Sequence, residues 1–308
     1  KLSRRSTPWP FRESERPMMF NLSRMIPDHF AIANLLRYIT FRSACACLTA
    51  LIVSFVLGPT VIRWLRSVQG QGQPIRLDGP ERHLIEKKGT PTMGGLLILF
   101  AVVISTLLWV DLRNGYVWAV MFVTLTYGAL GFVDDYLKIT KRDSKGVNGR
   151  VKLLVQALVG LVAAMWIADM GRDPIDTALT FPVFKELALQ LGIFFPVVGM
   201  LVMIGASNAV NLTDGLDGLA IVPTIITAGV FALIAYLVGN RIFADYLQLH
   251  PVAGAGELMV FCAALIGAGM GFLWYNAPPA AVFMGDIGSL ALGGALGAVA
   301  VATKHEIV

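Results

Sequence analysis

The sequence predicts an all-α, polytopic integral membrane protein with a polar active-site cleft at one membrane face. Three observations predict this class. The 308 residues are 56% hydrophobic and only 15% charged, and their mean hydropathy is +0.68. The apolar residues form runs of about 20, which is the length that spans a bilayer as one helix. The charged residues gather in short segments between these runs, which leaves no room for a separate soluble domain.

Eight apolar runs follow one another along the chain, and each predicts one transmembrane helix. They comprise residues 44–65, 94–110, 116–133, 151–168, 190–210, 218–238, 256–275 and 287–303. Residues 1–30 precede them and are largely polar and basic, so we expect an N-terminal extension without ordered structure. Residues 31–308 are expected to form one transmembrane domain.

The loops after the first and third runs are basic, whereas those after the second, fourth and sixth runs carry few basic residues. The basic residues are Arg66, Arg76, Arg82, Lys87 and Lys88 in the first loop, and Lys138, Lys141, Arg142, Lys145 and Arg150 in the third. Lys and Arg concentrate in cytoplasmic loops. We therefore expect these two loops to face the cytoplasm, together with the segments that join the fifth run to the sixth and the seventh to the eighth.

The third run ends in the charged segment "GFVDDYLKITKRDSKG". On a continuing helix Asp134, Lys138 and Lys141 lie on one face, at positions i, i+4 and i+7. A carboxylate beside lysines suits a phosphate-handling site, where one group takes a proton or holds a metal and the others hold anionic oxygens. The alternative is a helix end whose solvated charges anchor it among the lipid headgroups.

The segment "SNAVNLTDGLDGLA" joins the fifth run to the sixth. Asn208, Asn211 and Asp214 recur at every third residue, so on a helix they occupy about a third of the circumference, and Asp217 follows them. Their oxygens are hard ligands that suit Mg²⁺, or a ribose and a base. The alternative is a cytoplasmic turn capped by Asp and Gly. That alternative does not explain polar residues that step back into the apolar run.

Two further segments border the second and eighth runs. In "NAPPAAVFMGDIGSLALGG", Asp286 lies at a helix N-terminus, where backbone N–H groups also favour phosphate, and Asn276 and Phe283 precede it in a loop with two prolines. The alternative is that Asp286 is only the N-cap of that helix. In "EKKGTPTMGG", Lys87 and Lys88 precede a turn rich in Gly, Pro and Thr. The alternative there is an ordinary basic loop.

Taken together, these segments predict one cleft on the cytoplasmic face, with several acids and lysines. Mg²⁺ commonly takes one or two carboxylates together with substrate phosphates. Phosphoryl transfer needs positioning, neutralisation of charge and a base. A site of this kind at a membrane face implies one water-soluble and one lipid substrate.

The stretches "KKGTPTMGG", "GFVDDY", "NAVNLTDGLDGLA" and "FMGDIGSLALGG" closely resemble a known family, the polyprenyl-phosphate N-acetylhexosamine-1-phosphate transferases. The resemblance extends from about residue 30 to the end of the chain. Within the family it points to transfer of phospho-N-acetylmuramoyl-pentapeptide from UDP-MurNAc-pentapeptide to undecaprenyl phosphate. It implies lipid I and UMP as products, in the first membrane step of peptidoglycan synthesis, with Mg²⁺ as cofactor.

The resemblance also implies a location and a set of partners. It implies a multi-pass protein of the bacterial inner membrane whose active site faces the cytoplasm. The expected partners are the two substrates and the lipid bilayer. Nucleic acid is not expected, and a homodimer is left open.

The resemblance assigns roles to individual residues. Asp134 and Asp135 match the acidic pair of the family, with Asp134 as the base that deprotonates the lipid phosphate. Asp286 matches the Mg²⁺ ligand, and Asp134 is expected to share the metal, so these three aspartates are the expected catalytic residues. Whether a carboxylate attacks as a covalent nucleophile stays open. The expected substrate-binding residues are Lys88, Asn211, Asp214, Asp217, Asn276 and Phe283 by resemblance, and Lys138, Lys141 and Asn208 by their helix faces.

The chain departs from the family pattern after the eighth run. The family has ten spans and a cytoplasmic histidine-bearing loop between the last two, whereas this sequence stops at "TKHEIV". We therefore expect the transmembrane domain to be incomplete at its C-terminal end. We also expect Gly293, Gly294 and Gly297 of the eighth run to face lipid where missing spans would otherwise cover them.

Two alternative functions stay open at this point. A secondary transporter also carries intramembrane acids, but its site lies near the bilayer midplane between repeats. A sister transferase that uses UDP-N-acetylglucosamine would share the metal chemistry. Incubation with each UDP-sugar and a polyprenyl phosphate, followed by detection of UMP, separates these possibilities.

Overall fold

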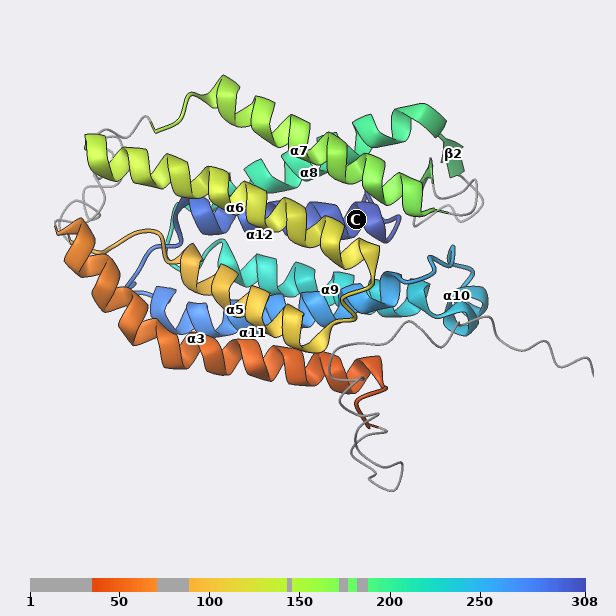
Figure 1. Ribbon diagram of the computed structural model, residues 1–308, viewed down its shortest axis with the longest axis horizontal. Coiled ribbons are helices and arrows are strands. Elements are labelled where there is room, and N and C mark those ends of the chain that lie inside the picture. Colours follow the sequence, from red (N-terminus) through yellow and green to blue (C-terminus); the bar gives the residue numbers. More distant parts are fainter. Residues whose placement is uncertain (1–34, 71–88, 143–145, 172–176, 182–187) are drawn as a thin grey trace, which may run out of the picture.

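The computed structural model describes residues 35–70, 89–142, 146–171, 177–181 and 188–308, so the predicted extension 1–30 and Lys88 lie outside the described residues. Each of the eight predicted runs is a helix (Figure 1). These helices are α3 (Ile39–Gln69), α5 (Gly95–Trp109), α6 (Gly115–Lys141), α7 (Gly149–Met170), α8 (Phe195–Thr213), α9 (Ile221–Gly239), α11 (Leu258–Asn276) and α12 (Gly285–Ala302). The predicted all-α fold class is confirmed.

Within the described residues, seven helices are long and apolar enough to cross a membrane. The eighth, α5, has 15 residues and is therefore about 22 Å long, which is shorter than the hydrocarbon core. The preceding residues are not helical because they pair with the loop before α12. Phe283 N donates to Pro91 O at 2.9 Å, and Gly94 N donates to Phe283 O at 2.8 Å.

Small elements that the sequence analysis did not predict lie between the long helices. β1 (Ala178–Thr180) and β2 (Ala188–Gln190) form an antiparallel pair in which Leu179 lies opposite Leu189. Two single 3-10 turns, η2 (Gly192–Phe194) and η3 (Ala255–Glu257), precede α8 and α11, and α10 (Arg241–Leu247) follows α9. Elements this short carry too few residues for a hydrophobic period to reveal them.

Helix α12 is the centre of the bundle, and every residue from Ile287 to Ala302 is buried. It packs against α6 and α8, with α5, α7 and α9 also in contact (Figure 1). Gly293 and Gly297 lie against the backbone of α8, and Gly294 lies against the ring of Tyr127 in α6. The expectation that these three glycines face lipid is therefore wrong. They allow the close helix approach on which membrane helix packing depends.

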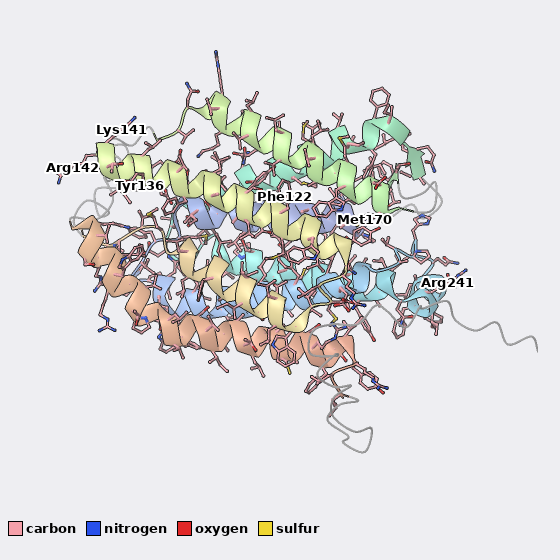
Figure 2. The ribbon with its side chains drawn as sticks, viewed as in Figure 1. Phe122, Tyr136, Lys141, Arg142, Met170 and Arg241 are labelled. Atoms are coloured by element: carbon pink, nitrogen blue, oxygen red, sulfur yellow. The ribbon has the colours of Figure 1, made fainter. Side chains whose placement is uncertain are left out.

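The second half of the bundle is organised around α11, which packs against α3, α9 and α5. The C-terminal ends of α6 and α8 and the N-terminal ends of α7 and α12 lie at one end of the bundle, whereas α10 and β2 lie at the other (Figure 1). Figure 2 shows Lys141 and Arg142 at the first end and Arg241 at the opposite end. We call the first of these the carboxylate end, after the cluster described next.

Candidate active site

Helix α6 continues beyond its apolar run to Lys141, and this extension carries the first two carboxylates. Asp134 and Lys138 are four residues apart, so they meet on one helix face, with Lys138 Nζ 2.5 Å from Asp134 Oδ2. Asp134, Asp135 and Lys138 are all buried. Lys141 is exposed at the helix end and lies outside this group (Figure 2).

Asp286 reaches the acids of α6 because two glycines allow close contact. A Cβ on Gly131 of α6 would overlap the carbonyl oxygen of Asp286. Gly285 has φ +74, a conformation that side chains disfavour, and a Cβ there would overlap Asp135 Oδ2. As a result, carboxylate oxygens of Asp134, Asp135 and Asp286 lie within 4.8 Å of one another.

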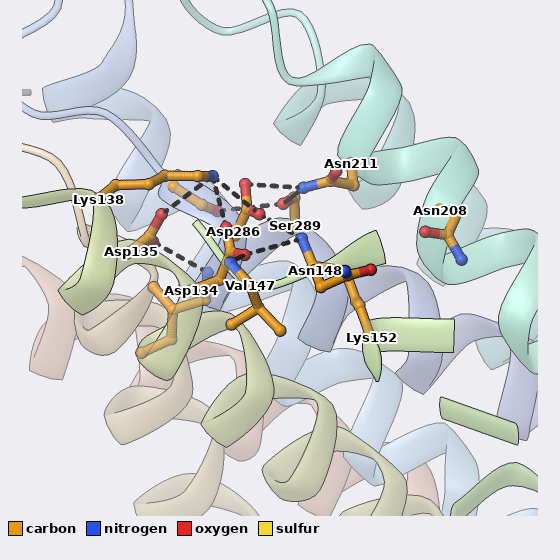
Figure 3. A network of polar contacts seen from close by, with 12 residues as sticks. Asp134, Asp135, Lys138, Val147, Asn148, Lys152, Asn208, Asn211, Asp286 and Ser289 are labelled. Atoms are coloured by element: carbon orange, nitrogen blue, oxygen red, sulfur yellow. Dashed lines mark hydrogen bonds and ion pairs between the residues drawn. The ribbon is translucent and has the colours of Figure 1, made fainter. Parts of the chain in front are cut away.

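Asp135 binds the start of α12 through a hydrogen bond between helices. Its Oδ2 accepts from Ile287 N at 3.2 Å. The N-cap of α12 itself is Met284, which has no side-chain capping bond. Asp286 stands in the first turn of α12, and its own carboxylate points to other partners (Figure 3). The capping role that the sequence analysis considered for Asp286 is therefore filled by Asp135, from a different helix.

Two lysines lie among the three carboxylates (Figure 3). Lys138 Nζ is 3.1 Å from Asp286 Oδ2 and 3.9 Å from Asp135 Oδ1. Lys152 of α7 places its Nζ 2.7 Å from Asp286 Oδ2 and 3.4 Å from Asp134 Oδ1. Lys152 is not among the site residues predicted from the sequence. The available signal was a charged residue just inside an apolar run, which is rare unless it has a partner.

The cluster carries more negative than positive charge. With every group counted in its ionised form, three carboxylates and two ammonium groups have a formal net charge of −1. Asp135 Oδ1 is buried and accepts no hydrogen bond from the described residues, although Lys138 lies nearby. Buried carboxylates are stable only when cations or donors surround them. The cluster therefore has both the charge and the free acceptor oxygen for a divalent cation with a preference for oxygen ligands.

The predicted residues of α8 divide between two positions. Asn211 joins the cluster, since its Nδ2 donates to Asp286 Oδ1 at 3.0 Å and to Ser289 Oγ at 2.8 Å. Asn208 lies apart from the cluster (Figure 3), and its Nδ2 donates to Gln156 Oε1 at 3.0 Å and to Ile204 O at 2.8 Å. Asn211 therefore contacts the carboxylate cluster, whereas Asn208 lies about one helical turn further into the bundle.

The other predicted residues lie at the C-terminal end of α11, which is Asn276, and in the loops after α8 and before α12. Asn276 is buried, accepts from Gly218 N at 3.0 Å and donates to Val282 O at 3.0 Å, so it ties the two loops together. Asp217 Oδ2 accepts from Ala280 N at 3.3 Å. Asp214 is half-buried at the C-cap of α8. Phe283 is also half-buried, and its backbone N donates to Pro91 O.

The fold and the site define a multi-pass membrane protein with a buried carboxylate–lysine cluster at one end of its helix bundle. Two sequence models of known families match the chain. The model of glycosyl transferase family 4 matches residues 117–304, and phospho-N-acetylmuramoyl-pentapeptide-transferase signature 1 matches residues 87–99.

Three curated relatives, each named phospho-N-acetylmuramoyl-pentapeptide-transferase, extend this result. The protein from Granulibacter bethesdensis is 70% identical over 291 residues, which are 94% of this chain and 80% of the relative. That from Gluconobacter oxydans is 60% identical, again over 94% of this chain and 80% of the relative. That from Maricaulis maris is 56% identical over 94% of this chain and 81% of the relative. The chain therefore belongs to glycosyl transferase family 4 and, within it, to the phospho-N-acetylmuramoyl-pentapeptide transferases.

Proposed function

We propose that the protein transfers phospho-N-acetylmuramoyl-pentapeptide from UDP-MurNAc-pentapeptide to undecaprenyl phosphate, at the cytoplasmic face of a bacterial inner membrane. One phosphate oxygen of the lipid bonds to the sugar-bearing phosphorus, the bond from that phosphorus to UMP breaks, and lipid I and UMP are the products. The observation that carries this proposal is the cluster of Asp134, Asp135 and Asp286 with two lysines at one end of an apolar bundle. A soluble and a lipid substrate can meet only at such a place.

Magnesium is the proposed cofactor, and the residues present fit it. Asp286 and Asp134 are the proposed ligands, because their carboxylate oxygens lie close together and the cluster has a net negative charge. When bound, Mg²⁺ would neutralise the charge of the diphosphate that is being cleaved. Without it, the net negative charge of the cluster repels two phosphorylated substrates.

The protein's own side chains perform the remaining steps in this proposal. Asp134 takes the proton of the lipid phosphate, and its Oδ1 is oriented by a hydrogen bond of 2.7 Å from Val147 N. Lys138 and Lys152 give up part of their ion pairing with Asp134 and Asp286 and bind anionic phosphate oxygens of the substrates instead. Asp135 keeps the first turn of α12 against α6, which maintains the position of Asp286.

The nucleotide-sugar pocket is proposed to lie between the loops that Asn276 ties together. Asp214, Asp217 and Phe283 lie on these loops next to the carboxylate end. Lys88 is proposed to complete the pocket from the segment before α5 and lies outside the described residues. Lys141 is proposed to contact substrate from the rim, since it is exposed at the end of α6.

The alternatives fit the observations less well. A transporter site is expected near the midplane, whereas these acids lie at one end of the bundle. A transferase specific for UDP-N-acetylglucosamine would share the cluster, but the relatives named above carry the name of the muramoyl-pentapeptide enzyme.

A direct assay tests the proposed function. The purified protein is incubated with undecaprenyl phosphate and either UDP-MurNAc-pentapeptide or UDP-N-acetylglucosamine, and UMP release is measured with and without EDTA. We expect UMP only from UDP-MurNAc-pentapeptide, and none after chelation until Mg²⁺ is restored. UMP release from UDP-N-acetylglucosamine at an equal rate would contradict the substrate, and full activity in EDTA would contradict the metal.

A further inference from the structure

A second polar layer lies one helical turn deeper in the bundle than the carboxylate cluster. Gln156 of α7 is fully buried, and its Nε2 donates to Ser207 Oγ of α8 at 3.0 Å. Its Oε1 accepts from Asn208 Nδ2 at 3.0 Å. Ser207 is also fully buried, and its Oγ donates to Leu290 O of α12 at 3.0 Å. The side chains of Gln156 and Ser207 together thus link α7, α8 and α12.

Residues of α7 and α8 also bind the carboxylate of Asp286 in α12. Lys152 precedes Gln156 by four residues on α7, and Asn211 follows Asn208 by three residues on α8, so each pair shares a helix face. Lys152 binds Asp286 Oδ2, and Asn211 binds Asp286 Oδ1. The hydrogen bonds of Gln156 to Ser207 and Asn208 therefore lie about one helical turn further into the bundle than the contacts of Lys152 and Asn211 with Asp286.

Packing alone does not explain a glutamine at this position. α7 and α8 are membrane-spanning helices whose other residues in this region are mostly apolar, and an apolar side chain of similar size would fill the same space. A buried amide is costly unless all its partners are present. Hydrogen bonds between membrane helices contribute little to stability, but a single buried polar residue can select one register between helices.

We propose that Gln156 is a positioning residue for the transfer reaction. By binding Ser207 and Asn208 it sets the register of α7 against α8, and this register places Lys152 and Asn211 on opposite oxygens of Asp286. Asn208 Nδ2 donates to Gln156 Oε1 and to Ile204 O, so in this proposal Asn208 is the partner of Gln156. This inference rests on the proposed function.

Three substitutions isolate this effect. Gln156→Met keeps the length of the side chain and removes all of its hydrogen bonds. Asn208→Leu removes the bond to Gln156 Oε1 while Ser207 still accepts from Gln156. Ser105→Ala is the control, because Ser105 is also fully buried and donates to Ala46 O at 2.6 Å between α5 and α3, away from the cluster.

Two measurements on the purified protein decide the question. One is the affinity for Mn²⁺ by electron paramagnetic resonance without substrates, and the other is kcat and KM for UDP-MurNAc-pentapeptide. We expect Gln156→Met to weaken Mn²⁺ binding and to lower kcat by about tenfold or more, as for other residues that orient metal ligands. We expect KM to change by less than about twofold. Ser105→Ala should change neither quantity.

The outcomes separate this inference from the proposed function. Mn²⁺ affinity equal to wild type in Gln156→Met, or an equal loss in Ser105→Ala, would overturn the role of Gln156. If Gln156→Met does not fold, Asn208→Leu takes its place, and wild-type Mn²⁺ affinity in that variant overturns the proposal. Absence of UMP release by the wild type contradicts the proposed function, and the Mn²⁺ comparison still decides the role of Gln156.

Discussion

The two carboxylate oxygens of Asp286 have different partners, and this asymmetry organises the cluster at the residue scale. Oδ2 faces the ammonium groups of Lys138 and Lys152, whereas Oδ1 accepts from the neutral amide of Asn211. The side chain does not cap its own helix, since Asp135 binds Ile287 N. The half-buried carboxylate of Asp286 therefore interacts with the cluster and does not cap its own helix.

The first prediction concerns Asp286. Asp286→Ala removes a proposed metal ligand, so activity should be abolished at every Mg²⁺ concentration tested. Asp286→Glu should retain a trace at most, because Mg²⁺ tolerates little change in geometry. Asp286→Ser tests whether a small neutral polar side chain in the first turn of α12 is sufficient for activity. UMP release by Asp286→Ser near the wild-type rate would contradict Asp286 as a metal ligand.

The second prediction concerns Asp134. Asp134→Asn keeps an oxygen that can accept from Val147 N but removes the proposed base. We expect turnover to fall by about 10²- to 10⁴-fold, with binding of UDP-MurNAc-pentapeptide largely retained in equilibrium dialysis. Asp245→Asn is the control, because Asp245 is exposed in α10 at the opposite end of the bundle. Turnover in Asp134→Asn equal to that of this control would exclude Asp134 as the base.

At the scale of the elements, the approach of α6 to α12 decides whether the cluster forms. The two helices pack closely, and Gly131 is buried where α6 meets the first turn of α12. A methyl group at this point cannot be accommodated by a side-chain rotation, because the obstructing atoms belong to the backbone of Asp286. The position of α12 thus depends on the absence of one side chain on α6.

The third prediction follows from this contact. Gly131→Ala should separate α6 from α12, destabilise the protein by about 1–3 kcal/mol, and lower turnover by displacing Asp286 from Asp134. Gly205→Ala in α8 is the matched control, because Gly205 is exposed and no atom lies within 4 Å of the added Cβ. Thermal unfolding and UMP release measure the two effects. Equal behaviour of the two variants would exclude a close α6–α12 contact.

At the scale of the whole molecule, the two ends of the bundle differ in charge and chemistry. The carboxylate end carries Lys141, Arg142 and Arg150 beside the cluster, and Arg63 and Arg66 at the end of α3. Toward the other end lie Arg241 (Figure 2) and also Arg37, Arg42, Arg113 and Lys304. With Lys138 and Lys152, the carboxylate end has seven of the twelve basic residues that the structure describes, which predicts that this end faces the cytoplasm. The soluble substrate would then approach the site from the compartment in which UDP-linked precursors are present.

The fourth prediction tests this orientation. In intact cells a membrane-impermeant maleimide should label Arg241→Cys, whereas Lys141→Cys should react only after the membrane is opened. Both side chains are exposed, so accessibility within the protein does not distinguish them. The native Cys45, Cys47 and Cys262 lie within membrane-spanning helices, and the unsubstituted protein measures their background. Labelling of Lys141→Cys in intact cells would reverse the orientation.

The fold class, the positions of the eight long helices and the family could all be predicted from the amino-acid sequence. These features depend on local information, namely the length of an apolar run and the order of residues in a motif. The sequence also identified Asp134, Asp135, Asp286 and Asn211, which the structure brings together, because polar residues next to apolar runs are conspicuous.

Only the tertiary structure decided which side chains of different helices meet. A helix that is apolar on all sides carries no periodic signal of the face it buries, so the rotation of α7 and α8 could not be predicted. Consequently Lys152 and Gln156 were not predicted, nor was the hydrogen bond that Asn208 donates to Gln156. These contacts follow from backbone approaches at Gly131 and Gly293, where the absence of a side chain in one helix sets the position of another.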